Sequence, residues 1–204
     1  ERMRPLNLSE FVGQEHIVGE GKILNRAIEA DKLTSAIFYG PPGTGKTTLA
    51  KIIANTTNNN FTTLNAVTSG IKDIKEKISY AVDELSIYNK RTILFIDEIH
   101  RLNNVVEEYL YSAMEDYHID IVIDKGPNAR SIQLNLEQFT LIGATTRLGH
   151  LTSPLRDRFG VILRMDYYNP DELFQILMRT AQILNIELRP DGAAEIAKRS
   201  RGTP

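Results

Sequence analysis

The segment that most constrains the fold of this chain is Gly40–Thr47, whose sequence GPPGTGKT fits the pattern G-x-x-x-x-G-K-[ST]. In such a loop, backbone N–H groups wrap the phosphates of a nucleotide, and the glycines let the backbone approach them closely. The neighbouring residues fit this context. The apolar run Ala36–Tyr39 predicts a buried strand before the loop, and Thr48–Ala54 predicts a helix after it, with its partially positive N-terminus directed at the phosphates.

A second motif places two carboxylates directly after an apolar strand, at Ile93–Ile96 followed by Asp97 and Glu98. Ligands of open α/β sheets bind at the carboxyl ends of strands. We therefore expect Asp97 to hold Mg²⁺ and Glu98 to orient or deprotonate an attacking water. A glycine turn and an unrelated surface Asp-Glu pair is the weaker interpretation, because both motifs occur in the expected order.

The loop residues have matching expected roles. Lys46 is expected to reach the β- and γ-phosphates of ATP, and the Thr47 hydroxyl is expected to be a second ligand of Mg²⁺. Gly43, Gly45 and Thr48 complete the predicted phosphate contacts. The two motifs together predict binding and hydrolysis of a nucleoside triphosphate.

The composition is that of an ordinary globular domain, with 204 residues, 42% hydrophobic and 25% charged. The net charge of −2 gives no general attraction to nucleic acid, so any DNA contact would be local or made by a part not present here. The absence of cysteine excludes disulfides and thiolate metal sites and is compatible with the cytoplasm. We expect no membrane span, and the ends of the sequence suggest a fragment.

Strands alternating with helices predict an α/β fold with a mostly parallel sheet flanked by helices. Further strands are expected at Phe61–Ala66, Phe139–Thr145 and Gly160–Asp166, and helices at 71–85, Val105–Glu115 and 191–200. Asn169–Glu172 reads as a helix start, with an apolar stripe continuing to Leu184. We expect a large ATPase domain over residues 1–168 and the start of a truncated small helical domain over 169–204.

One segment interrupts this alternation. The apolar-alternating runs Ile119–Asp124 and Ser131–Leu136 flank a turn signal at Lys125–Asn128, which predicts a β-hairpin. The hairpin is expected either to engage a partner or DNA, or to extend the sheet with its apolar face covered. The residue pattern leaves both interpretations open.

Two further site residues are expected near strand ends. A polar side chain after the strand Phe139–Thr145 could sense the γ-phosphate, with Thr146 as the first choice and Thr145 as the second. Arg156 and Arg158 could reach the active site of a neighbouring subunit and stabilise transition-state charge. The alternatives are a strand-end hydrogen bond for the threonine and a solvated pair with Asp157 for the arginine.

Other patterns are weaker. Asp97–His100 matches the D-E-x-H string of two-lobed helicases, but the chain is too short for a second lobe. The four histidines lack metal-ligand spacing, which favours surface or polar-contact positions.

This ordered set of motifs resembles the AAA+ ATPases over essentially the whole chain. In the first half, three segments are similar to the RarA (MgsA) family of replication-associated recombination ATPases: Arg2–Pro5, Phe11–Gly19 and Thr63–Val67. That family is expected to lack the hairpin and to carry glutamate where this chain has Arg147.

From about Asp97 onward the sequence resembles the RuvB family of Holliday-junction branch-migration motors. The similar segments are Val105–Glu108, Ala113–Tyr117, Gly126–Pro127, Ala129–Ile132 and Phe139–Gly160. The two resemblances together suggest a hybrid joined near Asp97, within a motif that both families share.

The RuvB resemblance implies an arginine finger at Arg158, a nucleotide contact at Tyr168, and a hairpin Ile119–Leu136 that meets a RuvA-like partner. Both resemblances imply that Arg4, Val12 and Gly13 lie near the adenine. They also imply a ring that acts on branched DNA, through a C-terminal domain absent from this chain. We expect a cytoplasmic RuvB-type motor; a RarA-like ATPase, or a nucleotide-gated loader or scaffold with slow turnover, is the alternative.

Overall fold

The structure is a computed structural model that describes residues 2–122, 131–136 and 139–204. Its contacts divide the chain into two compact units. Unit 1 contains Glu1–Leu33, Phe38–Asn58 and Leu163–Pro204, and unit 2 contains Thr34–Ile37 and Asn59–Ile162. Five strands form a sheet in the order β2-β3-β6-β1-β7, and β1 (Ala36–Tyr39) and β7 (Val161–Arg164) each contribute residues to both units.

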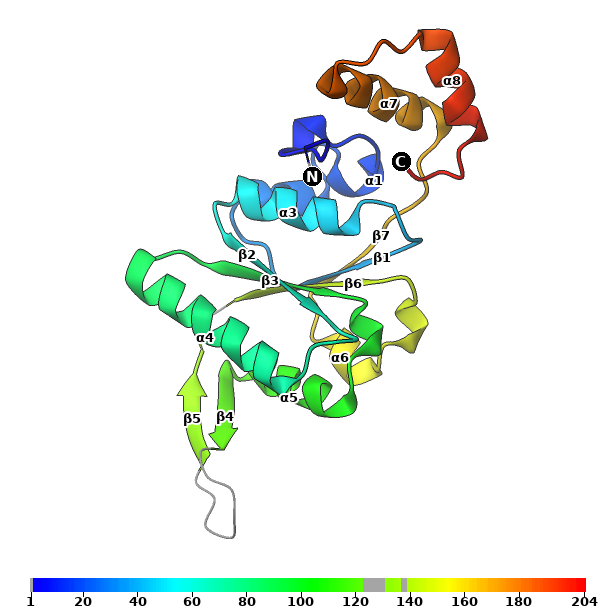
Figure 1. Cartoon of the computed structure of the whole chain (residues 1–204). Coiled ribbons are helices and arrows are strands. Elements are labelled where there is room, and N and C mark those ends of the chain that lie inside the picture. Colours follow the sequence, from blue (N-terminus) through cyan, green and yellow to red (C-terminus); the bar gives the residue numbers. More distant parts are fainter. Residues whose placement is uncertain (1, 123–130, 137–138) are drawn as a thin grey trace. The chain divides into compact units, whose positions relative to one another are not determined.

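In unit 2, the strands β2 (Asn60–Asn65), β3 (Thr92–Asp97) and β6 (Thr140–Thr145) pair in parallel. Residues 92–96 of β3 are all buried, as expected for a central strand covered on both faces. The helices α4 (Ile71–Tyr88) and α5 (Asn104–Glu115) lie on one side of these strands (Figure 1). Short elements follow: η2 (Ile99–Arg101), η3 (Leu148–His150) and α6 (Ser153–Asp157).

The parallel pairing determines where the polar strand ends lie. Asn65 is the register partner of Asp97, and Ile96 is the partner of Gly143. The carboxyl ends of β2, β3 and β6 therefore meet at one edge of the sheet. This edge carries Asp97 and Thr145, as the sequence predicted for open α/β sheets.

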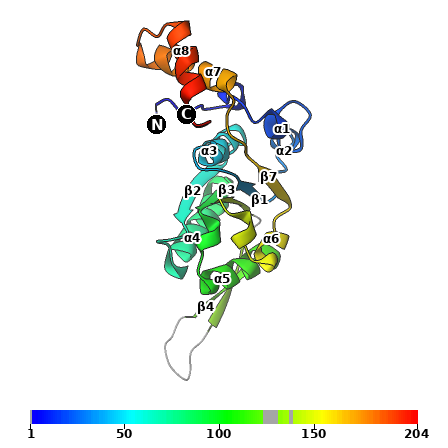
Figure 2. The same cartoon turned by 90° about the vertical axis from the view of Figure 1, so that its right-hand side faces the viewer.

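The inserted hairpin is present as two antiparallel strands, β4 (His118–Val122) and β5 (Ser131–Asn135), both labelled in Figure 1, with Ile121 opposite Ile132. Figure 2 shows β4 next to α5. The turn expected at Lys125–Asn128 lies outside the described residues. β4 begins shortly after α5 ends, and the Leu136 N–H donates to the Tyr117 carbonyl at 2.6 Å. The base of the hairpin is thus fixed to the end of α5.

In unit 1, α3 (Lys46–Thr56) follows the glycine-rich loop, and α7 (Pro170–Leu184) packs beside α8 (Pro190–Arg199). α7 starts where the sequence predicted, because Asn169 accepts from the Glu172 N–H and the Glu172 carboxylate accepts from the Asn169 N–H. Along the predicted apolar stripe, Leu173 and Ala181 are buried and Leu184, in the last turn of α7, is 42% exposed.

Three short elements near the N-terminus had no predicted counterpart: η1 (Leu8–Glu10), α1 (Glu15–Val18) and α2 (Ile23–Glu29). α1 begins after Gln14, whose backbone is left-handed, with φ of 60°. The Gln14 side-chain amide donates to the Asp166 carbonyl at 2.7 Å and accepts from the Asp166 N–H at 3.0 Å. This long-range contact fixes the segment. Within the described ranges, no helix is long and apolar enough to cross a membrane.

Gly40→Ala is expected to destabilise the protein. A Cβ on Gly40 would lie 2.1 Å from the Met165 backbone oxygen, next to the hydrogen bond from the Met165 N–H to the Tyr39 carbonyl. Backbone cannot yield as a flexible side chain does, so we expect a loss of about 1–3 kcal/mol in the free energy of unfolding. Chemical denaturation measures this loss.

Gly192→Ala is the matched control, because a Cβ there meets nothing within 4 Å and the residue lies in α8. Alanine favours a helix by up to about 1 kcal/mol over glycine, so this variant should be no less stable than the parent. Equal stability of the two variants would show that Gly40 tolerates a side chain.

Candidate nucleotide-binding site

The glycine-rich loop has the backbone that its sequence predicts. Gly43 and Gly45 adopt left-handed conformations, with φ of 77° and 91°, and Gly45 is the N-cap of α3. A Cβ on Gly45 would lie 2.9 Å from the Tyr168 hydroxyl and 3.2 Å from the Phe11 ring. Glycine is therefore required both by the backbone and by the close approach of these two rings.

Lys46 is buried at the start of α3, with 8% of its surface exposed. Its Nζ donates to the carbonyl oxygens of Gly40 at 2.9 Å and Pro41 at 2.6 Å. An ammonium group removed from water needs such acceptors, and a phosphate oxygen offers a stronger charge-assisted bond in their place. Thr47 and Thr48, in the first turn of α3, are half-buried.

Within unit 1, Tyr168 connects the glycine-rich loop to α7 and α8. Its side chain packs in an apolar cluster with Leu173 and Ala197, and its hydroxyl donates to the Thr44 carbonyl at 3.3 Å. Burial, with a smaller effect from the Glu172 charge, raises the pKa of Tyr168 to about 12. Tyr168 therefore remains a neutral hydrogen-bond donor beside the loop.

The predicted adenine contacts have different environments. Gly13 is buried with φ of 80°, and a Cβ there would lie 2.9 Å from Glu172 Oε1 and 3.0 Å from the Tyr168 ring. Val12 is half-buried and Arg4 is exposed. Gly13 thus lies beside Tyr168, and the roles of Gly13, Val12 and Arg4 toward the adenine stay predictions.

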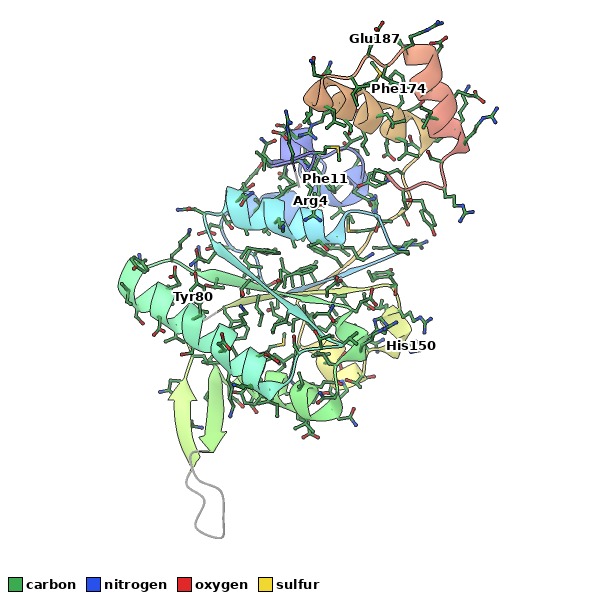
Figure 3. All side chains as sticks on the ribbon, in the orientation of Figure 1. Arg4, Phe11, Tyr80, His150, Phe174 and Glu187 are labelled. Atoms are coloured by element: carbon green, nitrogen blue, oxygen red, sulfur yellow. The ribbon has the colours of Figure 1, made fainter. Side chains whose placement is uncertain are left out.

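Phe11, which the sequence analysis did not assign to the site, is buried and contacts the loop at Gly45 (Figure 3). Its signal in the sequence was an apolar aromatic residue immediately before the predicted Val12–Gly13 contact.

In unit 2, Asp97 is the last residue of β3 and accepts from the Glu98 N–H at 3.1 Å. Glu98 has a left-handed backbone, with φ of 52° and ψ of 42°. This conformation is uncommon outside glycine and asparagine, and such strain is concentrated at functional sites. The following turn is held by Ile99, which packs so closely on β6 that a Cβ on Gly143 would lie 2.7 Å from Ile99 Cδ1.

His100 links the Glu98 turn to the end of β6. Its Nδ1 lies 2.8 Å from Thr145 Oγ1 and 3.4 Å from Glu98 Oε2, and its ring meets that of His150 edge-on. Burial lowers the pKa of His100, which the nearby Glu98 charge only partly opposes. The ring is therefore a neutral hydrogen-bonding partner at neutral pH.

The two candidate threonines differ in their surroundings. Thr145 is fully buried, and its hydroxyl is shared by His100 and the Arg147 N–H. Thr146 follows the strand end and is half-buried. This difference favours Thr146 as the residue with a hydroxyl available for a ligand, and its role stays a prediction.

Arg158 is paired with a residue other than the expected neighbour Asp157. Its Nη2 forms an ion pair with Glu115, its Nη1 donates to the Pro154 carbonyl at 2.8 Å, and its guanidinium lies 4.5 Å from the centroid of the Tyr111 ring. Arg156 has a weaker contact, 3.5 Å from the Ser153 hydroxyl.

Comparison with known families identifies the class. The profile described as the Holliday junction DNA helicase RuvB P-loop domain matches residues 3–165, and that of the RuvB AAA lid domain matches 168–204. The chain belongs to the RuvB family. The RuvB family's P-loop implies a nucleotide as the ligand of the loop at 40–47.

Individual relatives agree with this assignment. Over 204 residues the chain is 53% identical to the Holliday junction branch migration complex subunit RuvB of Salinibacter ruber and 52% identical to that of Parabacteroides distasonis. In both comparisons the match covers 99% of this chain and 58% of the relative. The solved Thermotoga maritima RuvB branch migration motor matches with a TM-score of 0.82 and 40% identity, over 100% of this chain and 62% of that protein.

The expected hybrid of RarA and RuvB is not supported. The RuvB profile runs from residue 3 across the supposed junction near Asp97 without a break. The N-terminal residues that suggested RarA have structural roles, since Phe11 packs on the loop at Gly45, Gly13 lies against Tyr168, and Gln14 binds the Asp166 backbone. A motif that holds a phosphate loop in place does not distinguish families that share the loop.

Proposed function

We propose that this chain is the ATP-hydrolysing core of a RuvB-type motor for branch migration of Holliday junctions. The observation that carries the proposal is the loop at 40–47, whose left-handed Gly43 and Gly45 lead into α3 beneath Phe11 and Tyr168. Such a loop offers backbone N–H groups and a helix N-terminus to a polyphosphate. The chain spans only 58% of the curated relatives, so the activity of the whole protein is inferred.

The proposed chemical roles are those of a phosphoryl-transfer site. Lys46 neutralises charge on the β- and γ-phosphates of ATP, and Glu98 orients or deprotonates the attacking water. Thr146 senses the γ-phosphate. Arg4, Val12, Gly13 and Tyr168 surround the base and sugar, with Gly43, Gly45 and Thr48 on the phosphates.

Thr47 and Asp97 offer a hydroxyl and a carboxylate, the hard oxygen ligands that suit Mg²⁺. Among the residues that the structure describes, no group of three His, Cys, Asp or Glu side chains could hold a metal by itself. Each of these groups is a kind of donor that fits Mg²⁺, which usually takes few protein ligands and completes its shell with water and phosphate oxygens. When bound, the ion would neutralise charge between the phosphates.

A nucleotide-gated scaffold with slow turnover is a weaker candidate, because a binding-only protein has no need of Glu98 held in a strained conformation after β3. Turnover measured with and without a synthetic four-way junction tests the motor assignment. We expect the junction to stimulate ATP hydrolysis in a form of the protein that assembles into rings. Equal slow turnover in both conditions would favour the scaffold.

We further propose a large ATPase domain over residues 1–168 and a lid over 169–204, assembly into a cytoplasmic ring, and action on branched DNA. The lid proposal is supported by an apolar cluster in which Tyr168, just before α7, packs with Leu173 of α7 and Ala197 of α8. The DNA contact is assigned to the part of the relatives' length that this chain does not span.

The hairpin Ile119–Leu136 is proposed as the arm that docks a RuvA-like partner. Ile121→Asp or Ile132→Asp, at directly opposed positions, should weaken RuvA binding more than basal ATP turnover. RuvA pull-down and turnover are measured together. A control is Gln133→Asp, one position along β5, because successive strand residues face opposite sides.

Two results would contradict this assignment. If both isoleucine variants unfold the protein, the apolar face belongs to the core. If they fold and still bind RuvA normally, the partner docks elsewhere.

A further inference from the structure

We propose that Tyr111 is the positioning residue for Arg158: its ring is a fixed platform that holds the guanidinium in the orientation needed to reach a neighbouring subunit's nucleotide. This inference rests on the proposed function, in which Arg158 is an arginine finger. Tyr111 lies in α5 and Arg158 follows α6, and both belong to unit 2.

The guanidinium of Arg158 lies over the ring of Tyr111. Its central carbon is 4.5 Å from the Tyr111 ring centroid, within the range of a cation–π interaction. The Arg158 Nε is buried without a hydrogen-bond partner, whereas Nη1 donates to the Pro154 carbonyl. The Tyr111 ring therefore supports Arg158 at Cζ, next to the Nε that makes no hydrogen bond.

The Tyr111 ring is itself locked in place. Its hydroxyl donates to Glu107 Oε1 at 2.5 Å and lies 3.1 Å from the Thr152 hydroxyl, which also donates to Glu107. Glu107 is buried, with 7% of its surface exposed. Burial, followed by the bond to Glu107, raises the pKa of Tyr111, so the hydroxyl keeps its proton and donates. α5 and α6 are thereby joined at the platform.

Glu115 has a different role from Tyr111. It pairs with Arg158 Nη2 from the last residue of α5, and its side chain is 59% exposed. Solvent screens such a pair, so a triphosphate can replace the carboxylate on Nη2. A cation–π contact with Tyr111 takes up no hydrogen-bond donor of the guanidinium, so Nη2 stays available to phosphate. Tyr111 can therefore keep Arg158 in place while its polar partner changes.

This arrangement has a kinetic consequence. Arginine has many rotamers in solution, and a platform restricts them before the transition state forms. Displacement of a catalytic group by about 1 Å can lower turnover on the order of 10²-fold. Loss of the platform should therefore lower kcat, with little change in nucleotide affinity or KM.

The test compares Tyr111→Ala, Tyr111→Leu and Tyr111→Phe in a ring-forming form of the protein, with ATP turnover, nucleotide binding and thermal unfolding measured for each. We expect alanine and leucine to lower kcat roughly 10- to 100-fold. Phenylalanine loses the hydroxyl's bond to Glu107 but keeps the ring, so its loss in kcat should be smaller than that of leucine. Tyr88→Ala, at an exposed position on α4, is the matched control and should leave kcat unchanged.

The decisive comparison is a double-mutant cycle with Arg158→Ala. If Tyr111 acts through Arg158, the double variant Tyr111→Leu/Arg158→Ala should turn over no more slowly than Arg158→Ala alone. A further loss in the double variant would indicate a general structural role and overturn the inference. Leucine preserves most of the ring's volume, so the cycle remains informative if alanine unfolds the protein.

The two levels of the proposal fail in different ways. Normal turnover of Arg158→Ala would show that Arg158 is not an arginine finger. An inactive Arg158→Ala with a fully active Tyr111→Leu would leave the finger in place and overturn only the role of Tyr111.

Discussion

Lys46→Ala is expected to abolish tight ATP binding, whereas Glu98→Gln is expected to retain binding and stop hydrolysis. Lys46 places a buried cation at the mouth of the phosphate loop, where it now donates to the carbonyls of Gly40 and Pro41. A hydrogen bond to a charged group contributes about 1.5–3 kcal/mol, so we expect affinity to fall roughly 10- to 100-fold. Binding of a fluorescent ATP analogue measures this loss.

Glu98→Gln removes only the group that acts on water. Glutamine is nearly isosteric, so the left-handed turn after β3 and its contact with His100 should persist. Positioned acid–base groups typically contribute about 10²–10⁴-fold, and turnover should fall by that factor. Lys198→Ala and Glu108→Gln, both at exposed positions, are the matched controls for charge removal. Near-normal hydrolysis by Glu98→Gln would assign the base to another residue.

The main elements of the fold could be predicted because local patterns determine them. The buried run Ile93–Ile96 forms β3, and Asn169 caps α7 with Glu172, as their sequences indicated. Long-range contacts were beyond local patterns. α1 has only four residues and is held by Gln14, which bonds to Asp166 across 152 positions of sequence. No propensity in the sequence reports such a bond.

The site shows the same limit. The loop and the Asp97–Glu98 pair could be located from spacing, since each function requires residues adjacent in sequence. Two contacts could not be located in this way, because each joins elements that are distant in the sequence. Phe11 lies near Gly45, and Glu115 pairs with Arg158. The hybrid interpretation was wrong for a related reason: Phe11 is required by packing on the loop and Gly13 by packing against Tyr168, so their presence does not identify a family.

Arg158→Ala is expected to lower ATP turnover on the order of 10³–10⁵-fold while changing nucleotide affinity much less. An arginine finger adds positive charge to the transition state of phosphoryl transfer, and it contributes little to ground-state binding. In this chain Tyr111, Pro154 and Glu115 hold the guanidinium. Glu115 is exposed to solvent, so its contact is the one that a phosphate can replace. Arg156→Ala, changed separately, tests the fallback residue.

A mixing experiment tests whether Arg158 acts on a neighbouring subunit. Arg158→Ala subunits and Lys46→Ala subunits should each be nearly inactive alone. Mixed rings contain some interfaces where an intact Lys46 faces an intact Arg158, so activity should partly return and depend on the mixing ratio. If assembly is confirmed and no ratio restores turnover, Arg158 does not act in trans. Recovery in the mixture requires one subunit to supply what its neighbour lacks, because neither variant carries both groups.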